Sequence, residues 1–232
     1  MIQKRKNIII VSMIMSLMIL FLIPYIQTTT TSHNTYQDLK TTKDQYIESD
    51  TTPDNPLYDE MKKINSNYLC WLHIPNTNID YPVVHPKDEQ YYLTHDFYNA
   101  SSPSGCLLCQ PDYHTDDYKL IIYGHHMKNG EMFQNLMYFK NKEFCNQNQK
   151  IYLYTANGTE CYQVAAVYNE PEQGLSNLYD DTPSSALVNY GMKKSYYHFN
   201  DFEVKINSQL LILVTCDYVK AGDRLVMIAI KT

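Results

Sequence analysis

The sequence predicts a mainly β domain, in which short strands form a small barrel or a sandwich. Two observations lead to this fold class. After Asn67, short runs of apolar, β-branched and aromatic residues alternate with turn residues at regular intervals. Two of these runs flank Asn157-Gly158, a dipeptide that strongly favours a β-hairpin turn. Strands at this spacing favour a barrel or a sandwich over a parallel α/β sheet, whose strands would alternate with long helices.

The expected elements follow the chain in order. A short entry helix is expected at residues 57–64, where Leu57, Met61 and Ile64 have helical spacing. The expected strands cover residues 71–74, 79–84, 120–123, 151–154, 161–168, 210–215 and 224–230. Residues 130–139 and 184–197 carry apolar side chains at helical spacing, and each is expected to form a short helix.

The N-terminus contains an apolar stretch, residues 7–26, without any charged residue. About 20 such residues suffice to cross a bilayer. The preceding segment, residues 1–6, contains Lys-Arg-Lys, whereas residues 27–32 carry no charge, so the positive-inside rule predicts a cytoplasmic N-terminus. We therefore expect a single-pass signal-anchor in the cell membrane and an extracellular domain. The alternative is a cleaved signal peptide, although no Ala-x-Ala cleavage site follows the apolar stretch.

The segment after the apolar stretch, residues 27–56, is rich in Thr, Asp, Asn, Ser and Lys and poor in aliphatic side chains. Such a composition buries too little apolar surface to offset the entropy of ordering, so we expect a polar spacer or a frayed helix. Residues 57–232 then form one domain with a substantial core. The net charge of −6 and the lack of a basic run argue against nucleic acid as a partner.

Six cysteines in an exported chain raise the possibility of disulfides. They are spread along a chain that is long enough to build its own core, which argues against a disulfide scaffold. Cys106 and Cys109 form a C-x-x-C motif that could be a local disulfide, two ordinary thiols or half of a zinc site. The second half of such a zinc site is missing from the sequence, so we predict neither a metal site nor a cofactor.

Cys216 is the cysteine whose neighbours favour chemistry. It ends the apolar run 210–215, and a turn containing Gly222 separates it from Arg224 at the start of the last expected strand. Partners near a hairpin turn lie about 5 Å apart, so the hairpin would place Arg224 beside Cys216. A nearby cation favours the thiolate, which is the nucleophilic form of cysteine. The alternative is a buried structural cysteine, the commonest state of a free thiol.

A second motif, Tyr123-Gly124-His125-His126, directly follows the expected strand 120–123. Gly124 permits a sharp turn at the strand end, which would expose the next side chains at the rim where sites are usually assembled. His125 is therefore a candidate base. It could instead be a hydrogen-bonded structural histidine, or bind metal together with His126, although adjacent residues on a strand point to opposite faces.

These segments together resemble the sortase family. Leu213-Val214-Thr215-Cys216 resembles the L-x-T-C core of the sortase signature. Gly124-His125 resembles the histidine motif of that family, and Arg224 stands at the position of the family's arginine. Class B is favoured by Trp71 and by the segments 76–84, 91–98 and 123–133, and the likeness covers roughly residues 58–231. One departure is Ile212, which stands where the signature usually has Thr and bears on fine substrate contacts.

The resemblance implies a closed sortase-type β-barrel with an N-terminal helix and a further helix in the long connection before the strand of Cys216. It also implies a cysteine transpeptidase without a cofactor, in which Cys216 is the nucleophile, His125 its proton partner and Arg224 the charge-stabilising group. The residues that the resemblance places at the substrate are Leu213, Thr215, Tyr123 and Asp217.

The implied partners are surface proteins with a C-terminal sorting signal, which the enzyme would cleave after Thr. A cell-wall peptide or its lipid-linked precursor would supply the amine that takes the acyl group. Two other functions stay open on the residues alone. One is an exported cysteine endopeptidase that uses water as acceptor. The other is an inactive surface-binding module with the same fold.

Overall fold

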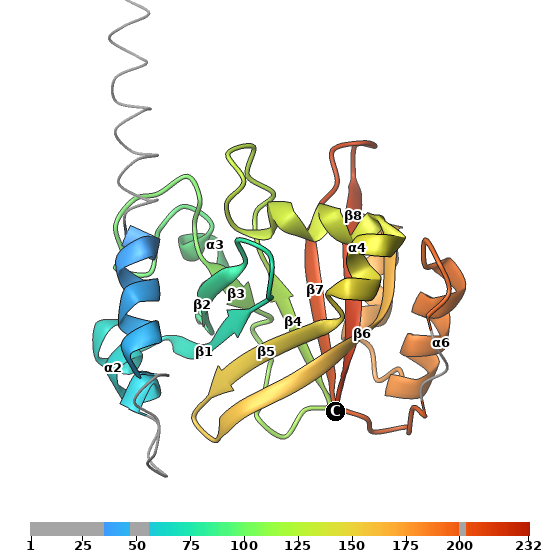
Figure 1. The fold of residues 1–232 in the computed structure, drawn as a ribbon, viewed down its shortest axis with the longest axis horizontal. Helices are drawn as coiled ribbons and strands as arrows, with labels where there is room; N and C mark the ends of the chain where they lie inside the picture. The colour runs from blue at the N-terminus through green and yellow to red at the C-terminus, as the bar shows by residue number, and fades with distance from the viewer. Residues whose placement is uncertain (1–34, 47–55, 200–202) are drawn as a thin grey trace, which may run out of the picture.

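The centre of the molecule is a closed β-barrel with the strand order β1-β2-β3-β4-β7-β8-β6-β5 (Figure 1). The computed structural model describes residues 35–46, 56–199 and 203–232. The mainly β prediction is confirmed, and of the two predicted architectures the chain adopts the barrel.

The predicted strands are all present, with ends that differ by a few residues. Their bounds are β1 Tyr68–His73, β2 Asp80–Val84, β3 Leu107–Cys109, β4 Lys119–Tyr123, β5 Lys150–Thr155, β6 Gly158–Pro171, β7 Leu210–Cys216 and β8 Asp223–Lys231. The Asn-Gly hairpin joins β5 to β6, with Thr155 paired to Gly158. The residue pattern did not predict β3. This short strand runs parallel to β2 and antiparallel to β4, and so completes the barrel wall between them.

Short helices connect the strands. They are α2 Pro56–Ile64, α3 Glu89–Tyr92, the 3₁₀ helix η1 Phe133–Lys140, α4 Lys142–Gln147, the 3₁₀ helix η2 Glu172–Leu175, α5 Ser176–Tyr179 and α6 Ser184–Lys194. The entry helix is confirmed as α2, which buries Leu57 and Met61 one turn apart. The two other expected helices correspond to η1 and to α6, which ends three residues earlier than predicted.

Within the segment expected as a polar spacer or a frayed helix, residues 35–46 form a helix packed on the barrel (blue in Figure 1). Leu39 is fully buried and Tyr36 is 3% exposed. The Tyr36 hydroxyl donates to the Gly105 carbonyl at 2.6 Å, and Lys43 Nζ lies 2.9 Å from the Asp80 carboxylate. Tyr36, Leu39 and Lys43 have helical spacing, and these three side chains attach an otherwise polar helix to the barrel.

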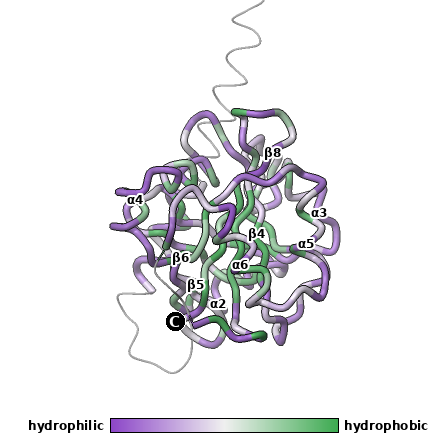
Figure 2. Tube along the Cα trace, turned by 90° about the vertical axis from the view of Figure 1, so that its right-hand side faces the viewer, coloured by the Kyte–Doolittle hydropathy of each residue, from purple (hydrophilic) through white to green (hydrophobic). Residues whose placement is uncertain are grey.

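Two apolar clusters lie on the two faces of the barrel wall, as period-2 alternation requires. Leu211 and Leu213 of β7 belong to the inner cluster, which also receives the N-terminal helices. Ile212 and Val214 belong to the outer cluster, which is covered by the α5–α6 segment. Figure 2 shows the hydrophobic residues gathered along these central strands and the hydrophilic ones around them.

The six cysteines are all free thiols, and Cys106 and Cys109 are both buried. Of the readings of the C-x-x-C motif, the local disulfide does not describe them in this structure. No helix within the described ranges 35–46, 56–199 and 203–232 has the length and apolarity to span a membrane. The predicted anchor, residues 7–26, lies outside these ranges.

Candidate active site

The β7–β8 hairpin places Cys216 directly opposite Arg224. Cys216 is the last residue of β7, and its side chain follows Ile212 and Val214 in alternation on the outer face of the wall. Directly opposed residues of an antiparallel pair project from the same face, so the guanidinium and the thiol share one side of the sheet. Both side chains are partly exposed. The neighbourhood predicted for Cys216 and Arg224 is therefore confirmed at the level of the strand register.

The predicted histidine reaches the same end of the barrel because β4 runs parallel to β7, with Tyr123 paired to Val214. Gly124 continues the pairing through its N–H, 3.3 Å from the Val214 carbonyl. The Thr215 hydroxyl donates to the Gly124 carbonyl at 2.8 Å. His125 is the next residue, so the loop that carries it begins beside the end of β7. In Figure 1 the loops after β4 and β7 project from the same end of the barrel.

The His125 ring contacts a loop that the sequence did not connect with it. Nε2 lies 2.9 Å from the Leu93 carbonyl, which can only accept, so Nε2 carries the proton. Nδ1 is then the nitrogen that a neutral His125 offers as an acceptor. Leu93 itself is 41% exposed and lies just after α3. This contact joins residues 32 apart in the chain, and no local pattern announces it.

Arg224 is held by a carboxylate that the sequence also did not reveal. Its Nη2 lies 3.1 Å from Glu172 Oε2, at the start of η2. The backbone N–H of Glu172 donates to the Gly222 carbonyl at 2.9 Å, which fastens η2 to the β7–β8 turn. Glu172 is 61% exposed, so this ion pair lies at the surface and is open to displacement.

Asp217, the residue after Cys216, is buried and ionised. Its carboxylate pairs with Lys140 and accepts from the Asn169 side-chain amide. Burial alone would raise the pKa of Asp217, but the hydrogen bonds from Lys140 and Asn169 hold that pKa below its ordinary value. The side chain also accepts from the Val219 N–H at 3.1 Å. Asp217 thereby braces the first residues of the β7–β8 turn.

Three of the four predicted substrate residues are buried in this structure. Leu213 and Thr215 alternate with Cys216 and project to the inner face, where they are 0% and 2% exposed. Asp217 is likewise 3% exposed and committed to Lys140 and Asn169. The structure thus places Leu213, Thr215 and Asp217 inside the fold, and their contact with substrate stays a prediction. Ile212, the departure from the signature, lies on the outer face but is fully buried in the outer cluster.

Tyr123 is the predicted substrate contact that lies on the outer face. It is partly exposed, and its hydroxyl is hydrogen-bonded to the hydroxyl of Tyr179 at the end of α5. Burial raises the pKa of Tyr123 far above its ordinary value, so the phenol stays protonated. The α5–α6 segment thus forms the side of the site next to Tyr123.

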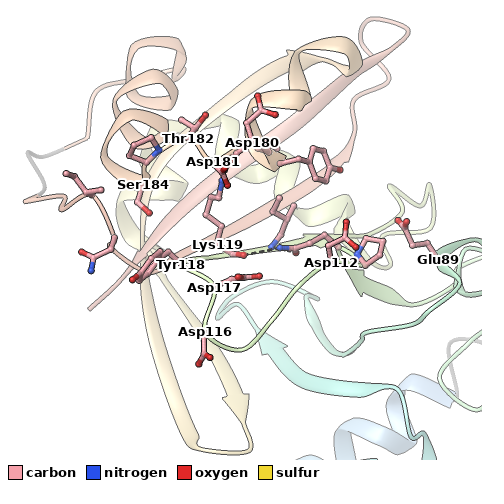
Figure 3. Close-up of a pocket in the computed structure, with 18 residues that line it drawn as sticks. Glu89, Asp112, Asp116, Asp117, Tyr118, Lys119, Asp180, Asp181, Thr182 and Ser184 are labelled. Atoms are coloured by element: carbon pink, nitrogen blue, oxygen red, sulfur yellow. Dashed lines mark hydrogen bonds between the residues drawn. The ribbon is translucent and has the colours of Figure 1, made fainter.

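A hollow of about 810 Å³ lies between the loop joining β3 to β4 and the α5–α6 segment, and Tyr179 is one of the residues that line it (Figure 3). Carboxylates from both sides surround it, namely Glu89, Asp112, Asp116, Asp117, Asp180 and Asp181. Lys119 lies among them and donates to the Asp180 carbonyl at 2.5 Å. No cysteine or histidine is found among the described residues that line the hollow.

Comparisons with known proteins point to one family. The sequence profile of the sortase domain matches residues 72–232. Sortase B of Listeria monocytogenes is 28% identical over 174 residues, which cover 71% of this chain and 69% of that protein. The crystal structure of Clostridium perfringens sortase B is 29% identical, with a TM-score of 0.70 and coverage of 75% of this chain and 98% of that one.

A further structure shares the fold alone. It is the Staphylococcus aureus sortase B–substrate complex, which has a TM-score of 0.80 at 20% identity and covers 89% of this chain and 98% of that one. The profile match spans more than half of the sequence and includes the strands β4, β7 and β8 that carry the site. The chain therefore belongs to the sortase family of cysteine transpeptidases, and its relatives place it in class B.

Proposed function

We propose that Cys216, His125 and Arg224 are the catalytic residues of this sortase. The observation that carries the proposal is the register of β7 and β8, in which Cys216 and Arg224 are directly opposed on the outer face. The parallel pairing of β4 with β7 supports the inclusion of His125. Substrate contacts are proposed for Tyr123, which lies on the same face, and for Leu213, Thr215 and Asp217 at the end of β7.

The substrate is a surface protein with a C-terminal sorting signal, which the enzyme cleaves after Thr. The thiolate of Cys216 attacks the Thr carbonyl carbon, a C–S bond forms, and the C–N bond to the next residue breaks. His125, as imidazolium, gives its proton to the departing amine. Arg224 donates hydrogen bonds to the oxyanion, for which its planar guanidinium and permanent charge are suited. A thioester between the surface protein and Cys216 results.

The acceptor is an amine of a cell-wall peptide or of its lipid-linked precursor. The amine attacks the thioester carbon, a new amide bond forms, and the C–S bond breaks to restore the thiolate. The proton lost by the amine returns to His125. The exposed ion pair of Arg224 with Glu172 supports this scheme, because an exposed carboxylate can yield the guanidinium to an incoming substrate at little cost.

The enzyme works at the cell surface, anchored through residues 7–26 with residues 1–6 in the cytoplasm. The sequence pattern supports this topology. Expression of the full chain with a C-terminal tag tests it. The tag should sediment with membranes and be removed by protease added to intact cells. A mature protein that begins after residue 26 would instead establish a cleaved signal peptide.

The catalytic proposal is tested with the full chain in detergent and a panel of fluorogenic sorting peptides. Cys216→Ala should abolish cleavage, and an added amine should divert the acyl group from hydrolysis to a peptide–amine product. Cys161→Ala is the matched control, because Cys161 is also partly exposed but lies on β6 beside the C-terminal end of β8. This control should retain full activity.

Two outcomes would contradict the proposal in different ways. Cleavage that survives Cys216→Ala would reject Cys216 as the nucleophile. Cleavage of unrelated peptides at a rate indifferent to the amine would assign the same residues to an endopeptidase.

A further inference from the structure

His126, the neighbour of the predicted catalytic histidine, makes a contact that the scheme above does not use. Its Nδ1 lies 2.8 Å from the backbone carbonyl of Cys216. These residues are 90 positions apart in the chain, so the contact joins the β4 loop to the end of β7. A carbonyl oxygen only accepts, and Nδ1 therefore carries the proton in this contact.

A second side chain holds the His126 ring in place from the β7–β8 turn. Tyr218 stacks on the ring, with 4.8 Å between ring centroids and 28° between their planes. The Tyr218 hydroxyl also donates to the His126 backbone carbonyl at 3.2 Å. Tyr218 itself is 63% exposed, so it covers the imidazole from the solvent side without belonging to the core.

These contacts form a closed loop around the proposed nucleophile. The His126 ring contacts the backbone of Cys216, Tyr218 lies two residues after Cys216, and Tyr218 returns to His126. His125 is covalently attached to this arrangement, and its own carbonyl accepts from the Phe133 N–H at 2.9 Å. The contacts of His126 and Tyr218 thus set the distance between the backbones of His125 and Cys216, the two residues proposed to react.

We infer that His126 is a positioning residue, which with Tyr218 fixes the backbone of Cys216 relative to His125. This inference rests on the proposed roles of Cys216 and His125. A displacement of about 1 Å between reacting groups can lower the rate about 100-fold. The hydrogen bond that fixes the Cys216 carbonyl therefore affects the rate of the reaction. Because His126 acts through the geometry of the thiol and does not bind substrate, its loss lowers kcat and leaves KM nearly unchanged.

The test compares two substitutions of His126 in the full chain in detergent. His126→Asn keeps an N–H near the position of Nδ1, whereas His126→Phe keeps a ring for Tyr218 but removes the donor. We expect His126→Phe to lower kcat about tenfold, and His126→Asn to stay within about threefold of the wild type. His114→Phe is the matched control, since this exposed histidine lies in the loop before β4, at the other end of that strand.

Alkylation of Cys216 by iodoacetamide, followed on its tryptic peptide, supplies a second readout that needs no sorting substrate. His126→Phe should change its rate constant, and His126→Asn should restore it. If the wild type processes no sorting peptide but this alkylation pattern holds, the proposed function fails and the role of His126 stands. Wild-type kcat and alkylation in His126→Phe, or equal losses in His126→Phe and His126→Asn, would overturn the inference.

A variant outside the core guards against a folding defect in His126→Phe. Tyr218→Ala removes the stacking partner from an exposed turn, so its melting temperature should stay close to that of the wild type. We expect a loss in kcat of about threefold, smaller than for His126→Phe because the donor to Cys216 remains. An unchanged kcat in Tyr218→Ala would show that the ring is not held as inferred.

Discussion

At the scale of single residues, Gly124 shows how packing determines what the strand end can present. A Cβ built at Gly124 would lie 2.4 Å from Leu107 Cδ2 and 2.8 Å from the Phe133 ring. Both neighbours are fully buried, so neither has free space into which to move. Glycine is required here because the backbone passes directly over the inner core, and this close passage is what places His125 at the rim.

We predict that Gly124→Ala lowers the free energy of unfolding by about 1–3 kcal/mol, the usual cost of overpacking a core. It should also lower kcat/KM more than tenfold, because the shift occurs one residue before His125. Urea unfolding and peptide cleavage measure the two effects. The double variant with Leu107→Ala should be less destabilised than the sum of the single variants, since the clash is then relieved. Additive effects would show that Leu107 is not the obstacle.

Arg224 leads to a prediction that separates charge from geometry. Arg224→Lys keeps the positive charge but loses the planar set of donors, so we expect kcat/KM to fall about 100-fold. Its stability should change by less than about 1 kcal/mol, because the ion pair with Glu172 lies at the surface. Peptide cleavage and thermal unfolding of the same preparation measure both quantities. Near-wild-type activity in Arg224→Lys would show that Arg224 contributes only its positive charge and that its planar set of donors is not needed.

At the scale of elements, the helix formed by residues 35–46 is joined to the barrel by a buried ion pair. Lys43 is 4% exposed and its Nζ lies 2.9 Å from Asp80, which also accepts from the Trp71 indole N–H at 2.6 Å. Burial alone would raise the pKa of Asp80, but His73, Lys43 and Trp71 around the carboxylate lower that pKa to about 2. The helix is therefore attached by a carboxylate that stays ionised down to strongly acidic pH.

This shift predicts how stability depends on pH. An ordinary Asp has a pKa of about 3.9, so a folded-state value of about 2 means that the unfolded chain takes up the proton first as pH falls. The stability that Asp80 contributes, about 2 kcal/mol, is fully present above pH ~5 and is lost as pH falls toward 2. Asp80→Asn should thus destabilise the protein at pH 7.

Urea unfolding from pH 7 down to pH 3 checks this prediction. The difference between the wild type and Asp80→Asn should shrink as the pH falls. Asp44→Asn is the control, since Asp44 also lies 3.0 Å from Lys43 but has a 64% exposed side chain. A constant difference between the wild type and Asp80→Asn across the pH range would contradict the assigned cause.

At the scale of the whole molecule, the features that the sequence predicted are those with local signals. The strands, the Asn-Gly hairpin and the pairing of Cys216 with Arg224 depend on residues close together in the chain. The three-residue strand β3 has no such signal, because its pairing with β2 and β4 is decided by closure of the barrel.

The contacts around the site were missed for the same reason. Leu93 and Glu172 are distant in the chain from His125 and Arg224, and the barrel fold brings these residues together. The inner location of Leu213 and Thr215 follows from alternation once Cys216 is known to face outward, but the sequence does not say which face of β7 meets the barrel interior. A continuous apolar strand is buried on both faces and hides this choice.

The extent of the folded unit is the last prediction at this scale. The sequence placed the start of the domain at residue 57, whereas Tyr36 and Leu39 are buried against the barrel. A chain that begins at residue 47 loses these contacts, and we expect it to be less stable by several kcal/mol than one that begins at residue 35, since a buried Leu alone contributes about 2–5 kcal/mol.

Cys106 offers a direct measure of the same boundary. It lies 3.5 Å from the Tyr36 hydroxyl, and burial raises the pKa of its thiol to about 12, which keeps it protonated and unreactive. Removal of residues 1–46 uncovers this thiol, so its alkylation by iodoacetamide at pH 8 should be much faster in the shorter chain. Leu39→Ala in the full chain should be destabilised in the same direction while Tyr36 still covers Cys106. The chains that begin at residues 35 and 47 could instead have equal urea midpoints and equal Cys106 reactivity. The helix would then contribute neither burial nor stability, and the folded domain would begin at residue 57 as the sequence predicted.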